Sequence, residues 1–384
     1  MLANIGKIQN NIPKVCYEEI VFTYFMTKST LNFKFFLWLS FCFYLLTYSG
    51  VTKSAVILQY HHVSTNTPTS TSISPQQFEK HLRYLKDNNF NVVALDQIVE
   101  AIKTQQPLAD KTVAITFDDA YLSILTQAKP LLDRFDFPFT IFINPALVER
   151  GSTHYLTWQQ LKLMADDGVI IANHGYNHDS LARIPQHLTE QQWLIQYGKL
   201  LEQAEQMIKN KTGQNWRYFA YPYGEFSQAG LIWLKKQNFI GFGQQSGAVG
   251  LQSNLAALPR FPASQPYDKL SSLKDKLHAL PFYLQIDQNA ERYIYRQEEL
   301  TSASFTFENN DFYPKLLSCY VTGLGKQTIH WQNKNSFTIN FADHLPVGRV
   351  RANCTAPSKT HRGRFYWYSH PWFILHQSGD WYPL

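Results

Sequence analysis

Hydrophobic and polar positions from residue 55 onward alternate between two kinds of stretch. Short runs rich in branched and aromatic side chains, such as AVILQYHHV from Ala55 and TVAITFDD from Thr112, predict buried strands. Between them lie amphipathic stretches such as SPQQFEKHLRYLKDNN, whose apolar residues recur at helical spacing. Alternating strands and helices indicate a mainly parallel sheet with helices outside it, and seven or so such units are enough to close a barrel. We therefore expect an α/β fold, a distorted barrel, over residues 55–285.

The pattern changes after residue 285. Runs such as SASFTFENN, KQTIHWQN and GRVRANCTA alternate in polarity between turn residues, which predicts short strands. We therefore expect a small β-rich module over residues 286–384. It contains Cys319 and Cys354, and an exported domain would join such a pair in one disulfide. Two unrelated buried thiols are the alternative.

Residues 1–54 have the layout of a leader. Lys28 and Lys34 precede an uncharged apolar run from Phe35 to about Tyr48, as in a secretory signal. The run is shorter than the ~20 residues that a membrane-spanning helix needs, so cleavage of the leader and its retention as a single anchor both remain open. We expect export to the periplasm or cell envelope, with anchoring to the inner membrane as the second option.

Composition and charge narrow the classes of partner. A hydrophobic share of 45% with 17% charged residues excludes wholesale disorder. The formal net charge of +6 is spread along the chain rather than gathered into a basic stripe, so we expect no nucleic-acid partner. Aromatic residues make up 15% of the chain, and partly exposed rings can serve as platforms for sugars as well as fill a core.

Acids and imidazoles follow several of the predicted strands. In parallel α/β folds, ligands bind at the carboxyl ends of strands, where the connecting loops converge. The polar residues at these positions are His61, His62, Asp118, Asp119, His174 and His178. We therefore expect them to meet at one end of the barrel.

These residue types suit a metal centre. One carboxylate with two neutral imidazoles is a common ligand set for a divalent transition metal, and HGYNH places two histidines four residues apart. Two adjacent acids can divide the work, because one binds the ion while the other takes a proton from water whose pKa the metal lowers from ~16 toward ~7. The alternative for the acid pair is a helix cap followed by a first-turn acid.

Three motifs together resemble a known family. TFDDA, NHGYNH and RYFAYPYG are similar, in order, to the first three motifs of the NodB-homology polysaccharide deacetylases, carbohydrate esterase family 4. The resemblance covers about residues 55–285. It implies a distorted (β/α)7-type barrel that hydrolyses N-acetyl groups of a polysaccharide with one divalent metal ion, zinc in the first place, with cobalt, iron or nickel as alternatives.

The resemblance also implies a role for each motif residue. It assigns the metal to Asp119, His174 and His178. Asp118 would be the catalytic base, held by a charge-assisted hydrogen bond from Arg217. The backbone N–H of Tyr223, together with the metal, would stabilise the oxyanion.

Several residues are candidates for the general acid that protonates the leaving amine. The opening ILQYHHVS resembles a subset of the family, the poly-β-1,6-N-acetylglucosamine deacetylases, in which the first strand ends in tyrosine-histidine. This resemblance implies that His61 is the general acid, with His62 and His278 as alternatives; both first-strand histidines could instead merely cap the strand. The family's fourth motif is not recognisable, although Arg260 in LPRF lies where it is expected.

Aromatic residues near the motifs are candidates for binding sugar. Tyr121 follows the acid pair, Trp158 lies in YLTWQQL, and Tyr176 lies between the two motif histidines. We expect these three to contact substrate, although Tyr121 and Trp158 could equally pack beneath a loop.

We thus expect an exported, metal-dependent hydrolase that removes acetyl groups from an N-acetylated amino-sugar polysaccharide, either poly-N-acetylglucosamine-like or a cell-wall glycan. The rival from another class is a catalytically inactive carbohydrate-binding protein of the cell envelope, which would not need a free base such as Asp118 beside its ligand. A metal-free glycoside hydrolase needs two carboxyl groups ~5 to 9.5 Å apart across a sugar bond. Adjacent Asp118 and Asp119 fit that arrangement poorly.

Overall fold

The computed structural model describes residues 54–384, which lie in one compact unit. The predicted leader, residues 1–54, lies outside this range apart from Ser54. Among the helices of residues 54–384, none is long and apolar enough to cross a membrane.

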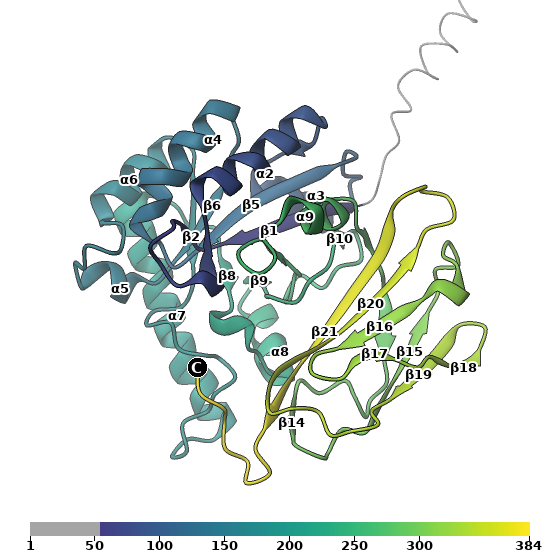
Figure 1. Ribbon diagram of the computed structural model, residues 1–384. Coiled ribbons are helices and arrows are strands. Elements are labelled where there is room, and N and C mark those ends of the chain that lie inside the picture. The colour runs from purple at the N-terminus through teal and green to yellow at the C-terminus, as the bar shows by residue number, and fades with distance from the viewer. Residues whose placement is uncertain (1–53) are drawn as a thin grey trace, which may run out of the picture. The chain divides into compact units, whose positions relative to one another are not determined.

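A curled, mainly parallel sheet forms the first part of the structure (Figure 1). Its strands, in spatial order, are β10 (Val249–Gly250), β1 (Ser54–Tyr60), β5 (Thr112–Asp118), β6 (Thr140–Ile143), β7 (Ile170–Asn173), β8 (Tyr218–Ala220) and β9 (Ile240–Phe242). In addition, β11 (Phe261–Pro262) pairs with β1 and β4 (Asn91–Val92) with β5, both in parallel. The chain after β9 returns to it, because Gly243 N donates to Leu258 O, and then joins β1 through β11. This closure confirms the predicted fold class.

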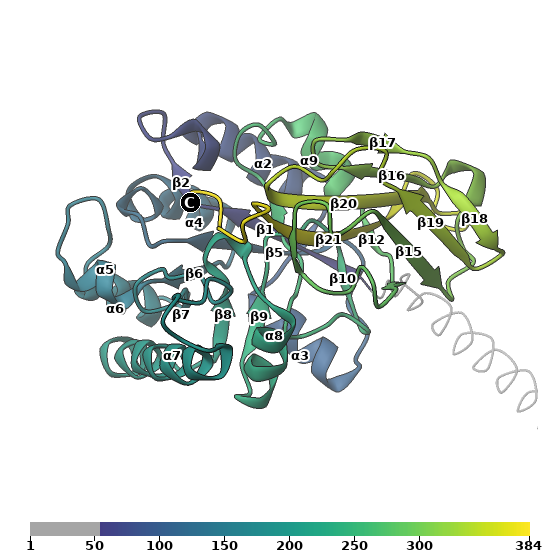
Figure 2. The same ribbon diagram turned by 90° about the horizontal axis from the view of Figure 1, so that it is seen from below.

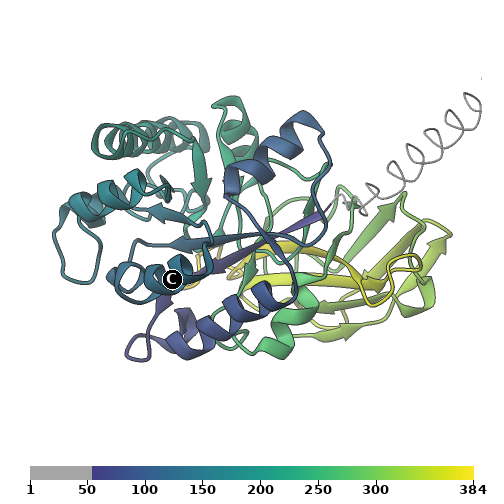
Figure 3. The same cartoon turned by 90° about the horizontal axis from the view of Figure 1, so that it is seen from above.

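Helices cover the outside of the strands (Figures 1 and 3). They are α2 (Pro75–Asp87), α3 (Leu95–Thr104), α4 (Lys129–Phe135), α5 (Pro145–Glu149), α6 (Trp158–Asp166), α7 (Glu190–Thr212), α8 (Gln228–Lys236) and α9 (Leu270–Leu277). Thr157 and Thr189 begin α6 and α7 with complete capping boxes, which satisfy the first amide groups of each helix. The acid pair does not cap a helix, since the π-helical turn after it (Ile124–Ala128) has Ser123 at its N-cap.

The two faces of β1 and β5 differ in a way that positions the site. Successive side chains of a strand point to opposite faces. On the face toward α2 and α4, Leu58 and Phe117 belong to one hydrophobic cluster, whereas Ile57 belongs to a second cluster on the other face. That second face becomes polar at the carboxyl end of each strand, with Gln59 on β1 and Asp118 on β5. Polar groups are therefore gathered inside one mouth of the barrel.

The C-terminal part consists of two β-sheets. One contains, in order, β12 (Leu280–Pro281), β21 (Phe365–Leu375), β20 (Gly348–Pro357), β16 (Ser318–Val321) and β17 (Gly325–Gln327), with β14 (Ile294–Arg296) also paired to β21. The other contains β13 (Leu284–Ile286), β15 (Ser302–Phe307), β19 (Ser336–Asn340) and β18 (His330–Asn333). The sheets share one hydrophobic core that includes Phe305 and Trp372. A β-rich C-terminal part is confirmed; the boundary at residue 286 stays a prediction, and β12 before it already pairs with β21.

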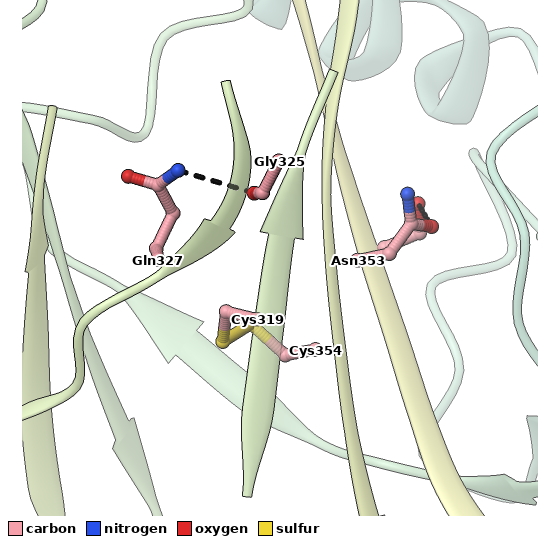
Figure 4. Close-up of a disulfide and its surroundings, with 6 residues drawn as sticks. Cys319, Gly325, Gln327, Asn353 and Cys354 are labelled. Atoms are coloured by element: carbon pink, nitrogen blue, oxygen red, sulfur yellow. Dashed lines mark hydrogen bonds between the residues drawn. A yellow bond between two sulfur atoms is a disulfide. The ribbon is translucent and has the colours of Figure 1, made fainter. Parts of the chain in front are cut away.

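Cys319 and Cys354 form a disulfide, as predicted. They are directly opposite each other on the antiparallel strands β16 and β20 (Figure 4). Beside them, Gln327 Nε2 donates to the carbonyl of Gly325 at 3.1 Å. The disulfide joins β16 and β20 of the same sheet, and the other end of β20 reaches the candidate site.

The β-sheets pack directly on the barrel. The ring of Trp367 on β21 meets that of Phe261 on β11 edge to face, with centroids 5.1 Å apart. Farther along, Tyr382 donates through its hydroxyl to the buried carboxylate of Glu225 at 2.8 Å. Strands β20 and β21 run beside the barrel (Figures 1 and 2). Directly after β1, the short strand β2 (His62–Val63) pairs with β3 (Ser72–Ile73).

Candidate active site

Asp118 is the last residue of β5, and its side chain is completely buried inside the barrel mouth. Arg260 donates to both of its carboxylate oxygens, with distances of 2.7 Å to Oδ1 and 2.8 Å to Oδ2. Gln59 Nε2 donates to Oδ2 as well, at 2.7 Å. Burial by itself favours the neutral acid, but the charge and hydrogen bonds of Arg260 outweigh it and lower the pKa of Asp118 to about 2. The carboxylate is therefore ionised and held in one orientation at neutral pH.

Asp119, His174 and His178 form a cluster next to Asp118. Asp119 Oδ1 lies 3.4 Å from Nε2 of His174 and 3.4 Å from Nε2 of His178. The candidate ligand atoms of all three residues lie within 4.8 Å of one another. Asp119 follows β5 directly, and both histidines belong to the loop after β7, two strands along the sheet.

The cluster fits a divalent metal by three observations. Two donor atoms bound at about 2.1 Å to one tetrahedral ion lie roughly 3.4 Å apart, which is the spacing found here. Oδ1 of Asp119 is buried and has no hydrogen-bond partner among residues 54–384. Nδ1 of His174 lies 2.7 Å from the carbonyl of Ala220, which can only accept, so Nδ1 carries the proton and Nε2 keeps its lone pair for an ion.

Electrostatics supports the same assignment. Burial lowers the pKa of His178 to about 4, and the neighbouring charge of His174 adds to the effect. For His174, burial also lowers the pKa, but the carboxylates of Asp118 and Asp119 outweigh burial and raise it. The negative potential that would hold a proton on His174 would equally attract a cation.

Two buried asparagines hold the loop that carries the histidines. Asn144, at the end of β6, donates to the backbone carbonyls of His174 and Gly175. Asn173, the last residue of β7, accepts from Gly175 N at 2.9 Å and donates to Glu205 on α7. These contacts fix the loop from both sides.

The backbone at the site is unusual. Asp119 (φ 72°), His178 (φ 66°) and Tyr223 (φ 59°) all lie in the left-handed region, although none is glycine. Each such residue costs about 1–3 kcal/mol and persists only where its surroundings impose it. All three of these residues line one cleft.

A cleft of about 410 Å³ opens over the cluster. It is lined by His61, Asp119, Tyr121, His178 and Tyr223 of the barrel and by Arg349 and Arg351 of β20. A ligand in this cleft would thus meet both the candidate metal cluster and the β-rich part.

Comparison with known proteins agrees with this geometry. A family model described as polysaccharide deacetylase matches residues 105–239, which include the acid pair and both cluster histidines. Residues 105–239 are a polysaccharide deacetylase domain. The predicted family is thereby confirmed, and with it the expectation of an enzyme of the deacetylase class.

Individual relatives are distant. YxkH of Bacillus subtilis (strain 168) is 28% identical over 209 residues, which are 54% of this chain and 71% of that protein. Poly-beta-1,6-N-acetyl-D-glucosamine N-deacetylase of Escherichia coli (strain K12) is 24% identical over 242 residues. That match covers 53% of this chain but 36% of the relative, so the chain spans about a third of its length.

A solved structure has the same fold. IcaB from Ammonifex degensii superposes with a TM-score of 0.52 at 24% identity, over 59% of this chain and 97% of that chain. The likeness shows the barrel fold of the deacetylase domain.

His61 stands where the first strand of the deacetylase barrel ends. Its Nε2 lies 3.9 Å from Oδ2 of Asp118, and it lines the cleft. His62 instead stacks on Tyr121, with ring centroids 3.5 Å apart, and burial lowers the pKa of His62 to about 4. His278 packs on Phe90 at the end of α9 and is not among the residues that line the cleft. Of the three candidates, His61 has the best position for a general acid.

The structure corrects the expectation for Arg217. Its guanidinium forms an exposed ion pair with Glu202 at 2.6 Å and donates to Gln237 O, outside the barrel. Arg217 follows α7 at the start of β8, which is the amino end of that strand, whereas Asp118 lies at a carboxyl end. Arg260, directly before β11, makes the contact that was expected of Arg217.

The predicted sugar contacts fall into two groups. Tyr121 lines the cleft and stacks between His62 and Tyr155. Trp158 does not line the cleft. Its indole N–H donates to Glu149 at 2.7 Å, and its ring packs against the hydrophobic cluster that contains Leu58 and Phe117. Tyr176 is likewise absent from the lining. The structure thus places Tyr121, and neither Trp158 nor Tyr176, at the cleft.

Tyr223 lines the cleft, on a 3-10 turn (Pro222–Gly224) that directly follows β8. Its ring meets that of His178 edge to face, with centroids 4.5 Å apart. The residue therefore lies beside the cluster of Asp119, His174 and His178, and the role of its backbone N–H stays a prediction.

Sequence reasoning missed Gln59, Arg349 and Arg351. Gln59 had a signal, since it is a polar residue in the otherwise apolar strand AVILQY. The two arginines had none, because their place at the cleft depends on how β20 packs on the barrel.

Proposed function

We propose that this protein removes acetyl groups, by metal-dependent hydrolysis, from an N-acetylated amino-sugar polysaccharide, either poly-N-acetylglucosamine-like or a cell-wall glycan. The observation that carries the proposal is the arrangement of Asp118 beside the cluster of Asp119, His174 and His178. A buried carboxylate outside the cluster, held by hydrogen bonds from Arg260 and Gln59, lies next to three residues able to bind one ion, and this combination suits hydrolysis rather than binding alone.

Asp119, His174 and His178 would hold the ion, with zinc as the first choice and cobalt, iron or nickel as alternatives. When bound, such an ion acidifies water and polarises the acetamide carbonyl as a Lewis acid. The hydrogen bond from His174 Nδ1 to Ala220 O would keep that ring in the tautomer needed for binding. The asparagines that hold the histidine loop would limit how far the two rings can move apart.

Asp118 would accept the proton of the attacking water. Its lowered pKa keeps it in the basic form at neutral pH, and Arg260 and Gln59 fix its orientation. Arg260 is a positioning residue in this scheme, because it acts through Asp118 and is itself completely buried.

His61 would protonate the departing amine. It lines the cleft and its Nε2 is 3.9 Å from Asp118, so it would face the scissile amide from the side of β1. The backbone N–H of Tyr223 would donate to the oxygen of the tetrahedral intermediate. Tyr121 would offer its ring edge or face to a sugar next to the acetamide.

The choice of a poly-N-acetylglucosamine-like substrate rests on the relatives. The Escherichia coli relative carries that activity in its name. So does a protein of Staphylococcus aureus (strain MRSA252), of which this chain covers 78% at 25% identity. Export to the cell envelope is part of the proposal, and the disulfide between Cys319 and Cys354 supports it because such bonds persist in oxidising compartments.

Acetate release tests the proposal. The full chain would be incubated with poly-β-1,6-N-acetylglucosamine, chitin oligomers and peptidoglycan, with and without a chelator. We expect release from at least the first of these, loss of release with chelator, and loss in Asp118→Asn. If no glycan yields acetate while the protein still binds one of them, the alternative of an inactive carbohydrate-binding protein would be correct.

A further inference from the structure

Two arginines of the β-rich part face the cleft of the deacetylase domain. Arg349 and Arg351 are two residues apart on β20, so their side chains leave the same face of the strand. Val350 and Ala352, on the opposite face, are buried in the core between the two C-terminal sheets. Both arginines line the cleft together with His61, Asp119 and His178.

The charges of this arginine pair are not balanced by protein carboxylates. Arg349 contacts Tyr223, with Nη1 3.4 Å from its carbonyl oxygen and the guanidinium 5.8 Å from its ring centre. Arg351 is half-buried, and within the part of the chain that the structure describes its guanidinium has no hydrogen-bond or ion-pair partner. Asp119 is the one acidic side chain among the described lining residues, and its Oδ1 faces the two histidines. Leu384 also lines the cleft, but among the described residues no ion pair joins its carboxylate to either arginine.

Three other arginines that are shielded from solvent each form an ion pair with a carboxylate. Arg183 is paired with Glu225 at 2.8 Å, Arg260 with Asp118 at 2.7 Å and Arg364 with Asp110 at 2.8 Å. Leaving a shielded charge without a partner destabilises a fold, and two like charges side by side add to that cost.

The environment of Arg351 agrees with this contrast. Burial lowers its pKa, and the charge of Arg349 acts in the same direction. An arginine pair that is kept beside an active site under these conditions indicates an anion that arrives from outside.

We propose that Arg349 and Arg351 form a subsite for an anionic group of the glycan, a carboxylate or a phosphate on a sugar next to the N-acetyl group that is cleaved. This proposal rests on the proposed function for the identity of the ligand as a glycan. Guanidinium groups suit carboxylates and phosphates because they donate several hydrogen bonds in one plane. The β-rich part would then select the substrate, favouring acidic acetylated glycans over neutral ones. It would disfavour glycans that already carry free, positively charged amines.

A matched set of oligosaccharides tests the subsite. The first is an N-acetylglucosamine–N-acetylmuramic acid tetrasaccharide, the second is the same molecule with its carboxylates converted to amides, the third is tetra-N-acetylchitotetraose, and the fourth is that oligomer with a 6-phosphate. Comparing the first oligosaccharide with its amide form measures the effect of the carboxylate alone. Comparing the phosphorylated chitotetraose with the unmodified one measures the effect of the phosphate. The full-length, metal-loaded protein would be compared with Arg349→Gln/Arg351→Gln and with Arg362→Gln, a control in the exposed turn after β20.

We expect kcat/KM for acetate release to be about tenfold or more higher for at least one acidic oligomer than for its neutral counterpart. In the double variant this ratio falls to within about twofold of unity, whereas Arg362→Gln keeps it. The ratio also shrinks between about 50 mM and about 500 mM salt, because screening weakens the attraction. Losing the contact between Arg349 and Tyr223 would change kcat/KM for acidic and neutral oligomers alike, so it does not affect their ratio. A wild-type ratio near one for both acids, or an unchanged ratio in the double variant, would overturn the proposal.

The proposed function and the subsite fail in different ways. If none of the four oligomers yields acetate, the proposed function is wrong for these glycans, and titration calorimetry then tests the subsite on intact ligands. Tighter binding of an acidic oligomer by about tenfold, lost in the double variant, supports the subsite without catalysis. Equal dissociation constants for acidic and neutral oligomers would refute it.

Discussion

The pair between Arg260 and Asp118 offers a direct test of how the base is held. Arg260→Met removes the guanidinium but keeps an unbranched apolar side chain in a completely buried position. The change deletes the two hydrogen bonds to Asp118, at 2.7 Å and 2.8 Å, and those to Thr116 and to the carbonyl of Gly243. The Asp118 carboxylate then keeps Gln59 Nε2 as its remaining partner from this set.

The expected cost is large. Removing one partner of a buried ion pair destabilises a protein by about 3–5 kcal/mol, because the other charge stays buried. The matched control is Arg217→Met, which breaks an exposed pair with Glu202 and should cost about 0–1 kcal/mol. Because burial now acts on Asp118 unopposed by Arg260, the pKa of Asp118 should rise in the Arg260 variant.

The pH dependence has a definite sign. The folded pKa of Asp118, about 2, lies below its ordinary value of 3.8. The pair therefore stabilises the fold fully above about pH 4, and this contribution is lost as the pH falls toward 2. Because the pKa of Asp118 is raised in Arg260→Met, the difference in stability between wild type and this variant should begin to shrink above pH 4 and continue to shrink as the pH falls toward 2.

Urea unfolding of the full chain, followed by circular dichroism at neutral pH, measures these free energies. In the double variant Asp118→Asn/Arg260→Met no buried charge is left alone, so it should be more stable than the sum of the two single effects predicts. An Arg260→Met variant no less stable than Arg217→Met would refute the reasoning. Strict additivity in the double variant would refute it as well.

Three further outcomes are expected. His61→Ala should lower kcat for N-acetyl sugars by about 10²–10⁴-fold but leave kcat for 4-nitrophenyl acetate unchanged, because that leaving group needs no proton. The control His278→Ala should change kcat for neither substrate, and equal losses on both substrates in His61→Ala would exclude His61 as the acid. Replacing Cys319 and Cys354 by alanine should lower the free energy of unfolding by about 4 kcal/mol, because the bond spans a sequence separation of 35 residues, and an unchanged urea midpoint would contradict this. Burial lowers the pKa of Lys276 to about 8, so above that pH the unfolded chain binds more protons than the folded one. The free energy of unfolding of wild type relative to Lys276→Met should therefore rise by about 2 kcal/mol from about pH 7.5 to about pH 9.5. A difference that does not change with pH would show that this lysine titrates normally.

The arrangement of the barrel could be predicted from local pattern. Apolar strands alternating with amphipathic helices fix a parallel sheet, and in such a sheet every carboxyl end reaches the same rim. That rule alone brings Asp119, which follows β5, and His174, which follows β7, to one place, and their candidate ligand atoms lie within 4.8 Å of each other. Motif similarity then distinguished Asp118 from Asp119, which pattern could not do.

What could not be predicted depends on contacts between distant segments. The resemblance assigns the hydrogen bond to Asp118 to Arg217, but Arg217 lies at the amino end of β8, and Arg260 makes that contact instead. Trp158 resembles a sugar platform until Glu149 is seen to accept its indole N–H. The place of Arg349 at the cleft follows from the packing of β20 on the barrel, which no local periodicity records.

The central claim is that Asp119, His174 and His178 hold one metal ion that is needed to hydrolyse an N-acetylated glycan. The most direct test titrates zinc into the chelator-treated full chain and measures bound metal and acetate release from poly-β-1,6-N-acetylglucosamine in the same samples. We predict that activity rises in proportion to bound zinc and saturates at one ion per chain, and that Asp119→Asn shows neither. Acetate release by the metal-free protein, or full activity in Asp119→Asn, would contradict the account.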